Sequence, residues 1–330
     1  MTTKNDDPVL DLSDAVKGSW HRFLDLYEPL RPELYRYCRH LTRSPWDADD
    51  LVQDTLARAF VTLGTLEGNA PARPRAWLFR VASNLWIDRV RRQRELASEI
   101  DAASTTSDPR AQREAAGTLL SQLSPQERAS VVLKDVFDLT LEEIAETLST
   151  TIGAVKAALH GGRSKLVDPA MHERARPLPS REVIDAFVDA FNAHDLDRVA
   201  ALLMERSTVE VVRVCTQYGR EAARSGALTG MMFGSRRLAA ADVEGGIDPR
   251  FIQGARPTPP RIEVRSHRGE WLLVHWYDHE DGEAVRAFTR VEIDGDHIAR
   301  VRNYFYTPDV IEEISRELDV PFKLNGHRYW

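Results

Sequence analysis

Apolar residues recur at helical spacing through the first half of the chain. Two runs carry the pattern: Phe23, Leu26, Tyr27, Leu30 and Leu34, then Leu51, Leu56, Ala59, Phe60 and Leu63. Apolar positions three and four residues apart predict helices with one buried face, and Ser44-Pro45 separates the two runs. Further helices are predicted over Trp77–Val90 and within Leu119–Leu166.

The pattern changes after Ser180. Two helical stripes come first: Val183, Ile184, Phe187, Val188 and Phe191, then Leu196, Val199, Leu202 and Leu203. Five runs rich in β-branched and aromatic residues follow: Val209–Val214, Arg261–His267, Trp271–Tyr277, Val285–Ile293 and His297–Tyr306. Arg268-Gly269 and Asp294-Gly295 separate successive runs and predict hairpin turns. Helices followed by strands indicate an α+β domain.

Composition excludes several classes of protein. The 330 residues suggest two or three domains, and 42% apolar with 29% charged residues is typical of a soluble globular protein. No run approaches the ~18 apolar residues of a membrane span, and the polar start Met1–Pro8 lacks the apolar core of a signal peptide. With only Cys38 and Cys215, a disulfide framework is excluded, so a reducing cytoplasm is expected.

Charge is distributed unevenly along the chain, although its net value of −7 gives no sign of nucleic-acid binding. Pro71–Arg94 has seven arginines against one aspartate, a local charge of +6. The acidic stretch Ala97–Leu148 has −6, and Ser149–Arg176 has +3. A basic run is often only a solvated face. Here it ends an apolar-periodic helix with Trp77 and Trp86, which favours a nucleic-acid surface.

Two short helices predicted after Thr140 have the spacing of a helix-turn-helix. Thr140 and Glu143 fit a capping box, and Thr151 is a candidate cap of the second helix. The second helix would present to a major groove the side chains of Thr151, Ala154, Lys156, Ala157 and His160, while Lys156, Arg163 and Lys165 would hold phosphates. An ordinary helical hairpin is the alternative that this pattern alone leaves open.

Three sequence blocks resemble the extracytoplasmic-function group of bacterial sigma factors, in the sigma-70 family. They are D-A-D-D-L-V-Q-D-T-L-A-R-A-F at Asp47–Phe60, P-R-A-W-L-F-R-V-A-S-N-L-W-I-D-R-V-R-R at Pro74–Arg92, and L-S-P-Q-E-R at Leu123–Arg128 with the helix-turn-helix Leu141–Arg163. Their order and spacing also match, and together they cover about residues 15–167.

The resemblance implies a role for each block. The first would dock on the clamp of the largest subunit of core RNA polymerase through Asp47, Asp49, Asp50, Leu51, Asp54 and Phe60. The second would open and read the −10 promoter element through Trp77, Arg80, Asn84, Asp88, Arg91 and Arg92, although a helix tryptophan such as Trp77 is also a common core residue. The third would contact the −35 element through Thr151, Lys156, His160, Arg163 and Lys165.

The third block departs from the family pattern at two positions. Arginines are common in the family where this chain has Ala158 and Gly161. Gly161-Gly162 also lowers helix propensity by ~1 kcal/mol per glycine relative to alanine. We therefore expect weaker −35 contacts.

The C-terminal half resembles a SnoaL-like domain, a cone-shaped α+β barrel. The motif N-A-H-D-L-D at Asn192–Asp197 carries the resemblance together with the later strands, whereas Thr216–Pro260 matches poorly and is interpreted as an insertion. Candidate acid, base or pocket residues of an enzyme would be His275, Asp278, His279 and Asn303, with Trp276, Phe288 and Tyr304 as walls. The pattern leaves open which side of the strand faces inward, and a structural histidine is the simpler interpretation.

The predicted architecture is therefore multidomain: two all-α sigma domains, the second with the helix-turn-helix, followed by the SnoaL-like barrel. Its expected boundaries are 15–97, a linker 98–113, 114–170, a linker 171–179, and 180–330 with a C-terminal tail. Tyr329-Trp330 at the end is expected to pack on the barrel or on the sigma half.

The predicted function is a sigma factor that directs transcription initiation, with no enzymatic activity, cofactor or metal. The expected partners are core RNA polymerase and promoter DNA, with an intramolecular contact between the SnoaL-like and sigma domains and no membrane. Two alternatives remain: a SnoaL-type enzyme fused to a DNA-tethering module, and a ligand-responsive repressor. A repressor needs neither the clamp block nor the melting block, which favours the sigma factor.

Overall fold

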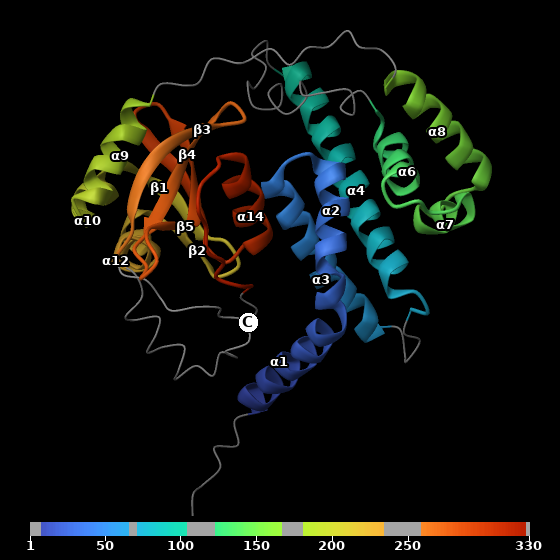
Figure 1. Ribbon diagram of the computed structural model, residues 1–330, viewed down its shortest axis with the longest axis horizontal. Coiled ribbons are helices and arrows are strands. Elements are labelled where there is room, and N and C mark those ends of the chain that lie inside the picture. The colour runs from blue at the N-terminus through green and yellow to red at the C-terminus, as the bar shows by residue number, and fades with distance from the viewer. Residues whose placement is uncertain (1–7, 66–70, 104–122, 167–180, 234–258, 328–330) are drawn as a thin grey trace, which may run out of the picture. The chain divides into compact units, whose positions relative to one another are not determined.

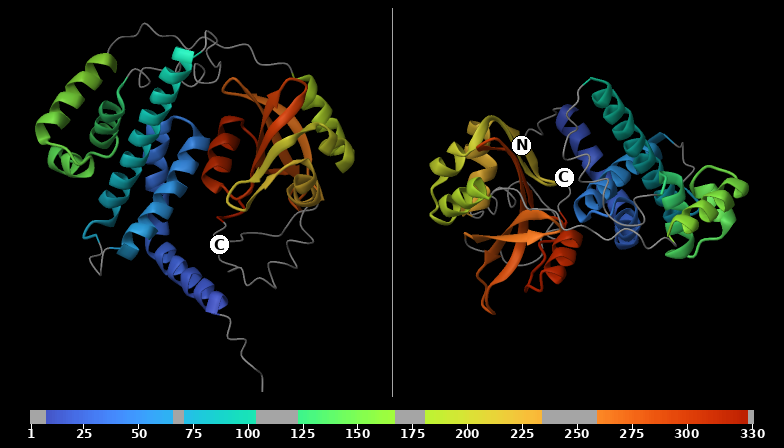
Figure 2. Two further views of the ribbon diagram at one scale, coloured as in Figure 1. Left: turned by 180° about the vertical axis from the view of Figure 1, so that it is seen from behind. Right: turned by 90° about the horizontal axis from the view of Figure 1, so that it is seen from above.

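The computed structural model describes residues 8–65, 71–103, 123–166, 181–233 and 259–327 (Figure 1). The chain divides into two compact units, Met1–Arg174 and Ala175–Trp330. The first is helical and the second combines helices with one sheet (Figures 1 and 2), so the predicted fold class is confirmed. Within the described ranges, no helix is both long enough and apolar enough to cross a bilayer.

The N-terminal unit begins with a group of long helices. These are α1 (Pro8–Tyr27), the single 3-10 turn η1 (Glu28–Leu30), α2 (Arg31–Thr42), α3 (Pro45–Thr65) and α4 (Pro74–Ala103). Proline stands first in α3 and α4. At this position the backbone N–H that proline lacks would have no partner within the helix. Helix α2 stops at Arg43, whose φ of 66° is left-handed, so the chain turns at the predicted Ser44-Pro45 break.

Helices α2, α3 and α4 pack against one another as a bundle. Its core is apolar and includes Leu34, Leu41 and Leu51, each fully buried. The Tyr37 hydroxyl and the Ser83 hydroxyl are hydrogen-bonded at 2.7 Å inside this core, and burial raises the pKa of Tyr37 far above its usual value. The hydroxyl therefore stays protonated and satisfied, as a buried polar group requires.

The second helical group consists of α6 (Pro125–Asp135), α7 (Leu141–Thr147) and α8 (Ile152–Leu166). The predicted capping box is present at α7: Thr140 Oγ1 accepts from the Glu143 N–H, and Glu143 accepts from the Thr140 N–H. The Thr140 N–H lowers the pKa of Glu143. Thr151 caps α8 by accepting from the Ala154 N–H at 3.2 Å, as expected.

The predicted linker and the observed helix overlap. The sequence places the start of the linker at Ser98, whereas α4 continues to Ala103. Low apolar content does not end this helix, because each residue added to a formed helix makes a further backbone hydrogen bond. The rest of the predicted linker, residues 104–113, and the second linker, 171–179, lie outside the described residues.

The C-terminal unit contains one six-stranded sheet. Its strands are β1 (Leu203–Val211), β2 (Cys215–Tyr218), β3 (Arg261–His267), β4 (Glu270–Tyr277), β5 (Ala284–Asp294) and β6 (His297–Tyr304). Their order across the sheet is β2-β1-β6-β5-β4-β3, with only β1 and β6 parallel. Positive φ at Arg268 and Gly269 matches the primed turn predicted between β3 and β4.

Helices cover both sides of this sheet (Figures 1 and 2). On one side lie α9 (Glu182–Asn192), α10 (Leu196–Ala201), α11 (Arg220–Ala223), a π-helical turn (Arg224–Leu228) and α12 (Thr229–Phe233). Their apolar residues join those of the sheet in one core, with Phe187, Phe191 and Met232 fully buried. On the other side, α14 (Pro308–Glu317) packs against β5. Helices therefore cover part of each sheet face, while β2 remains largely exposed.

Two predictions about this unit are wrong. Leu203 begins β1 instead of ending a helix, because α10 stops at Ala201 and Leu203 enters the sheet beside Ile298 of β6. The predicted insertion is also wrong over residues 216–233. This stretch forms β2, α11 and α12, and it buries Ala223, Leu228 and Met231 in the core. Residues 234–258, which complete the predicted insertion, are not described.

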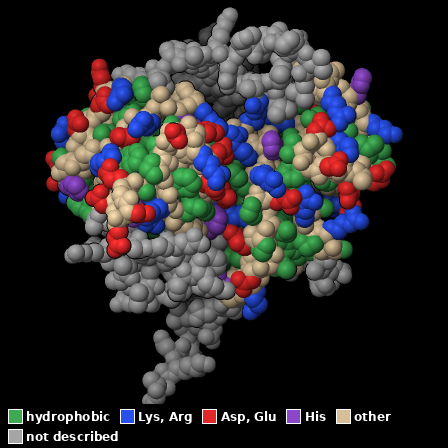
Figure 3. Space-filling view, viewed as in Figure 1, with side chains coloured by type: hydrophobic (Ala, Val, Ile, Leu, Met, Phe, Trp, Pro, Cys, Tyr) green, Lys and Arg blue, Asp and Glu red, His purple; other side chains and the backbone are tan. Residues whose placement is uncertain are grey.

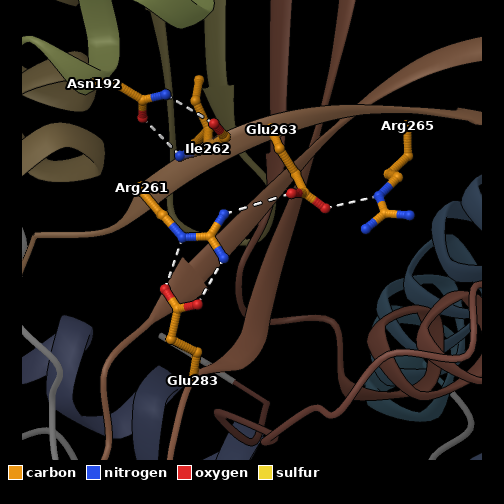
Figure 4. Close-up of polar contacts among 6 residues, drawn as sticks. All are labelled: Asn192, Arg261, Ile262, Glu263, Arg265 and Glu283. Carbon is orange, nitrogen blue, oxygen red and sulfur yellow. Dashed lines mark hydrogen bonds and ion pairs between the residues drawn. The ribbon is translucent and has the colours of Figure 1, made fainter.

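The N-A-H-D-L-D motif has a structural role at the end of α9. Asn192 Nδ2 donates to the Ile262 carbonyl at 2.9 Å, and Asn192 Oδ1 accepts from the Ile262 N–H at 2.8 Å (Figure 4). This pair of bonds ties the end of α9 to the edge strand β3. His194 then turns the chain with φ 56°, and Asp195 caps α10 through the Arg198 N–H.

The same edge strand carries a chain of ion pairs. Arg261 reaches Glu283 with 2.6 and 2.7 Å contacts, and Glu263 accepts from Arg265 at 2.7 Å (Figure 4). Charged side chains along an edge disfavour pairing with another sheet. The segment after α14 also packs on its own unit, since the Val285 N–H of β5 donates to the Pro321 carbonyl at 2.8 Å and the Lys323 N–H donates to the Val285 carbonyl at 2.9 Å. The predicted docking of Tyr329-Trp330 falls outside the described residues.

Candidate nucleic-acid interface

Helix α4 carries most of the basic and base-reading candidates. Asn84, Arg91 and Arg92 are exposed, and Asp88 lies half-buried one turn after Asn84. Positions four apart share a helix face, so Asn84 and Asp88 form a polar strip with Arg91, which contacts Asp88 at 3.2 Å. This strip is accessible to single-stranded or double-stranded nucleic acid.

Other candidates on α4 already have partners within the unit. Arg80 meets Glu146 of α7 at 3.2 Å, and Arg89, which lies beside the same strip, meets Asp54 of α3 at 2.8 Å. Trp77 is half-buried against Tyr27, with ring centroids 6.0 Å apart. Trp77 therefore serves the packing of α1 on α4, the role that a helix tryptophan often has.

Helix α8 exposes all five of its predicted DNA contacts: Thr151, Lys156, His160, Arg163 and Lys165. Lys156, His160 and Arg163 follow at spacings of four and three and so share a face. Arg163 is bonded to Asp135, and Lys165 Nζ donates to both oxygens of Glu127 at 2.8 Å. Partial burial would raise the pKa of Glu127, but hydrogen bonds from Lys165 and Ser124 lower it.

The glycine pair of α8 has a packing role that helix propensity does not reveal. A Cβ on Gly162 would lie 2.9 Å from Val131 Cγ2, and a Cβ on Gly161 would lie 2.8 Å from Glu127 Oε1. Both glycines therefore allow α8 to approach α6 closely. The propensity lost in α8 is offset by this packing and by the Lys165–Glu127 ion pair.

The acidic block of α3 divides into surface and core residues. Asp54 is exposed, Asp47 and Asp50 are half-buried, and Phe60 packs on Trp20 with ring centroids 5.0 Å apart. Asp49 and Leu51 are fully buried, and placing them on a binding surface is wrong.

Asp49 accepts instead from Arg31 Nη2 at 3.2 Å, inside the bundle. The helical period places this aspartate on the apolar face of α3, where only a paired charge is tolerated. Asp49 therefore fixes α3 against α2 and leaves Asp47, Asp50 and Asp54 to face solvent.

The helix-turn-helix group (residues 123–166) also contacts the α2–α4 bundle. Phe137, in the turn after α6, meets the rings of Tyr37 and Phe79 at 5.7 and 5.1 Å. Arg128 donates to the Leu41 carbonyl at 2.8 Å. Sequence reasoning missed these contacts, because a single aromatic residue in a turn has no periodic signal.

Family models match the N-terminal unit twice. The model of sigma-70 region 2 matches residues 26–95, and the model of sigma-70 region 4 matches residues 113–166. The first match includes α2, α3 and most of α4, and the second includes α6, α7 and α8. This half of the chain belongs to the sigma-70 family.

Relatives of the sigma-70 half include extracytoplasmic-function (ECF) proteins, which confirms the predicted resemblance. The chain is 30% identical over 222 residues to the ECF RNA polymerase sigma factor SigG of Mycobacterium tuberculosis, covering 56% of this chain and 60% of SigG. It is 27% identical over 174 residues to SigW of Bacillus subtilis, covering 47% and 92%. The chain thus spans less than two thirds of SigG.

One solved structure similar to the chain is an NTF2-like protein of unknown function from Cytophaga hutchinsonii. The identity is 12% and the TM-score 0.26, over 44% of this chain and 97% of that protein.

The candidate enzyme residues of the C-terminal unit lie on different sides of the sheet. His275 and Asn303 face the α9 side, where both reach Thr289 Oγ1, at 2.8 and 2.9 Å, and where His275 meets the Phe191 ring. Trp276 neighbours His275 in β4 and so points the other way.

Phe288 and Tyr304 pair with one another across β5 and β6, on the face opposite Thr289. Asp278 is exposed, and His279 is half-buried beyond the end of β4. The predicted walls and the predicted polar groups therefore do not enclose one site. Thr289, which links His275 to Asn303, was missed because a threonine in a strand carries no chemical signature.

Proposed function

We propose that this protein is an RNA polymerase sigma factor that directs promoter recognition and transcription initiation. The observation that carries the proposal is the presence, in one compact unit and in order, of the region 2 and region 4 domains. SigG and SigW, its relatives, are RNA polymerase sigma factors. The partners proposed are core RNA polymerase and promoter DNA, in the cytoplasm.

The residue roles follow from accessibility. Asp47, Asp50 and Asp54 would offer carboxylates to a basic surface of the polymerase clamp. Asn84, Asp88, Arg91 and Arg92 would hold and read an opened −10 strand, because an unstacked base needs polar groups and the displaced backbone needs cations. Thr151, Lys156 and His160 would contact the −35 element from α8.

We also propose that the C-terminal unit is a SnoaL-like regulatory domain that contacts the sigma half. The helices α9 to α12 on one sheet face, the strand order, and the hydrogen bonds of Asn192 to Ile262 support the assignment. An enzyme is less favoured, because the described candidates give no paired acid and base. His275 is buried, and burial lowers its pKa to about 3, so it is neutral and cannot act as an acid near pH 7.

The test is reconstitution with core polymerase. The full chain and a chain lacking residues 180–330 are each co-purified with core RNA polymerase and assayed by run-off transcription from promoters selected with the holoenzyme. We expect a stable complex and promoter-dependent transcripts with the full chain. DNA binding without polymerase binding would instead support the repressor.

A further inference from the structure

Helix α2 carries a row of basic side chains that none of the proposed polymerase or DNA contacts uses. The row consists of Arg36, Arg39, His40 and Arg43. Residues at positions i, i+3, i+4 and i+7 lie on one face of a helix, so these four side chains form a single stripe. We call it the α2 stripe. It extends over roughly 10 Å of the helix, at about 1.5 Å per residue.

The α2 stripe faces away from the core of the bundle. The side of α2 that lies opposite the stripe is fully buried and includes Leu34, Tyr37 and Leu41. The Arg36 side chain is 68% exposed, His40 is exposed, and Arg39 and Arg43 are half-buried. Figure 3 shows basic side chains at the surface over α2. The stripe is therefore accessible to a partner.

The positive charges of the stripe act on one another. Burial lowers the pKa of His40, and the charges of Arg39, Arg36 and Arg43 lower it further. Like charges four residues apart on a helix destabilise it. The stripe thus concentrates positive potential at one place on the surface, and an anion bound there would relieve the repulsion.

The positive surface continues from α2 to the start of α4. Glu33 lies 4.0 Å from Arg36 and 2.8 Å from Arg75, so one carboxylate is shared by two guanidinium groups. The Arg75 side chain is 44% exposed. Sharing leaves a net positive charge beside the stripe, on the side nearest to α4.

The dipole of α2 accounts for only part of the stripe. Its carboxyl end favours cations within the last turn, and that turn includes Arg39 and His40. Arg36 lies before this turn. Arg43 has a φ of 66°, a left-handed conformation in which glycine or asparagine would be less strained. The whole row is better explained by an anionic partner outside the helix.

The chemistry of the stripe fits a phosphate backbone better than a protein surface. A guanidinium group donates two parallel hydrogen bonds to a phosphate, whereas a protein interface needs an apolar or aromatic centre. A single strand would likewise need exposed rings on which its bases stack. Among the described residues, the large hydrophobic side chains that are exposed all lie outside α2: Leu26, Val61, Val136, Ile152, Tyr218 and Phe233.

We propose that the α2 stripe binds the phosphate backbone of double-stranded promoter DNA, as a contact separate from the polar strip of α4. The inference rests on the proposed sigma-factor function. A DNA strand carries one charge per about 3.4 Å of helix axis, so the stripe matches about three successive phosphates. Phosphate contacts carry no sequence information. The stripe would therefore position the duplex while α4 reads the opened strand.

The two DNA surfaces lie on different sides of the bundle. Tyr37, on the buried side of α2, stacks on Phe79 of α4 with ring centroids 4.6 Å apart. Asn84, in contrast, is exposed on α4. Because α2 and α4 pack through Tyr37 and Phe79, their outward faces point in different directions. The duplex on the stripe is thus not the segment whose strand lies on α4.

The salt dependence of duplex binding by the full chain tests the stripe. The probe is a fluorescent random-sequence duplex of about 20 base pairs, titrated without polymerase between about 50 and 200 mM salt. We expect Arg36→Gln with Arg39→Gln to bind about tenfold or more weakly at the lowest salt concentration. The slope of log affinity against log salt concentration should also fall by about two, one for each lost phosphate contact.

Two further variants separate position and charge from other effects. Arg198→Gln with Arg206→Gln removes the same charge at exposed positions of the C-terminal unit and should leave affinity and slope unchanged. Arg36→Lys with Arg39→Lys keeps the charge and should retain the slope. A loss of slope as large in the lysine variant or in the C-terminal variant as in the glutamine variant of the stripe would overturn the proposal.

Thermal unfolding distinguishes a binding role from a structural one. Because the glutamine variant of the stripe removes repulsion, we expect the N-terminal unit to unfold at the same temperature or higher. A lower unfolding temperature with unchanged duplex affinity would assign the stripe to stability and overturn the proposal. So would unchanged duplex binding with weakened binding of core polymerase, since the stripe would then contact an acidic protein surface.

The sigma-factor function can fail independently of the stripe. Duplex binding that depends on the stripe, in a full chain that directs no run-off transcription, would support the phosphate surface and contradict the sigma-factor function. Promoter-dependent transcription, with duplex affinity and salt slope unchanged in the glutamine variant of the stripe, would support the sigma-factor function and overturn the phosphate surface.

Discussion

At the residue scale, His275 shows how burial turns a candidate catalytic group into a pH-sensitive structural one. Its ring packs on Phe191 and bonds to Thr289, and burial lowers its pKa from 6.5 to about 3. The folded state keeps the ring neutral while the unfolded state takes up a proton below pH 6.5. The stability contribution is present above pH 6.5 and is lost as pH falls toward 3.

The expected loss is about 1.4 kcal/mol of unfolding free energy per pH unit within that window. His275→Gln cannot titrate and should flatten the slope between pH 6.5 and 5, above the range of most carboxylates. His194→Gln, at an exposed histidine, should retain it. Urea unfolding of the C-terminal unit, followed at several pH values, measures the pH dependence of the unfolding free energy in both variants and in the unaltered chain. A slope that is identical in all three proteins would contradict this origin.

The exposed arginines Arg91 and Arg92 of α4 are expected to act in promoter opening and not in polymerase binding. Arg91 and Arg92 are exposed, and the ion pairs of Arg91 with Asp88 and Glu95 are surface contacts worth about 0–1 kcal/mol. We expect Arg91→Ala with Arg92→Ala to reduce promoter opening about tenfold or more, because each lost phosphate contact weakens strand binding, while polymerase affinity stays within about twofold.

Permanganate reactivity of promoter thymines and binding of labelled core polymerase measure the two steps. Arg22→Ala, an exposed arginine on α1, is the matched control. Equal loss of opening and polymerase binding would remove these arginines from the melting step.

The acidic face of α3 should show the opposite behaviour. Asp50→Arg with Asp54→Arg places like charge against a basic clamp and should weaken core polymerase binding by about tenfold or more at low salt. Asp54 also pairs with Arg89, so unfolding is measured in parallel. Asp278→Arg with Glu280→Arg makes the same charge change at exposed positions of the C-terminal unit and should have little effect. Unchanged affinity of the α3 variant would exclude this surface.

At the element scale, the two glycine environments of α8 predict opposite effects of the same substitution. Gly162→Ala would gain helix propensity of ~1 kcal/mol but force a methyl group within 2.9 Å of Val131, and overpacking costs about 1–3 kcal/mol. We expect net destabilisation by about 0.5–2 kcal/mol. Gly153→Ala meets only Thr151 Oγ1, at 3.9 Å, and should stabilise by up to ~1 kcal/mol.

Calorimetry of the full chain resolves this comparison through the transition of the N-terminal unit. Stabilisation by both alanines would show that α8 does not need close approach to α6. Destabilisation by both alanines would show that the gain in helix propensity does not decide the stability at Gly153.

At the scale of the whole molecule, one prediction concerns the C-terminal unit. Tethering gives this unit an effective concentration of order millimolar near the sigma half, so a weak contact is enough for regulation. We expect removal of residues 180–330 to raise run-off transcription several-fold, since polymerase binding no longer competes with the tethered domain. Equal activity of the two chains, with scattering profiles of independent units, would contradict this regulation.

Much of the architecture was determined by the sequence itself, because the interactions responsible are local. The 3.6-residue apolar period predicted the helices, the Thr140–Glu143 pair predicted the start of α7, and Arg268-Gly269 predicted a hairpin. Caps and turns act over three or four residues, so they are readable without a fold. The order of the three sigma blocks indicated the family before any contact was known.

Only the tertiary structure decided which side chains remain accessible. Asp49 and Asp50 are neighbours of the same type, yet Asp49 is buried against Arg31 while Asp50 reaches the surface. Other features also depend on residues far apart in the chain. They are the choice of the inward side of β4, the parallel pairing of β1 with β6, and the contacts of Phe137 with Tyr37 and Phe79. Burial and pairing at such separations depend on packing, which no local pattern encodes.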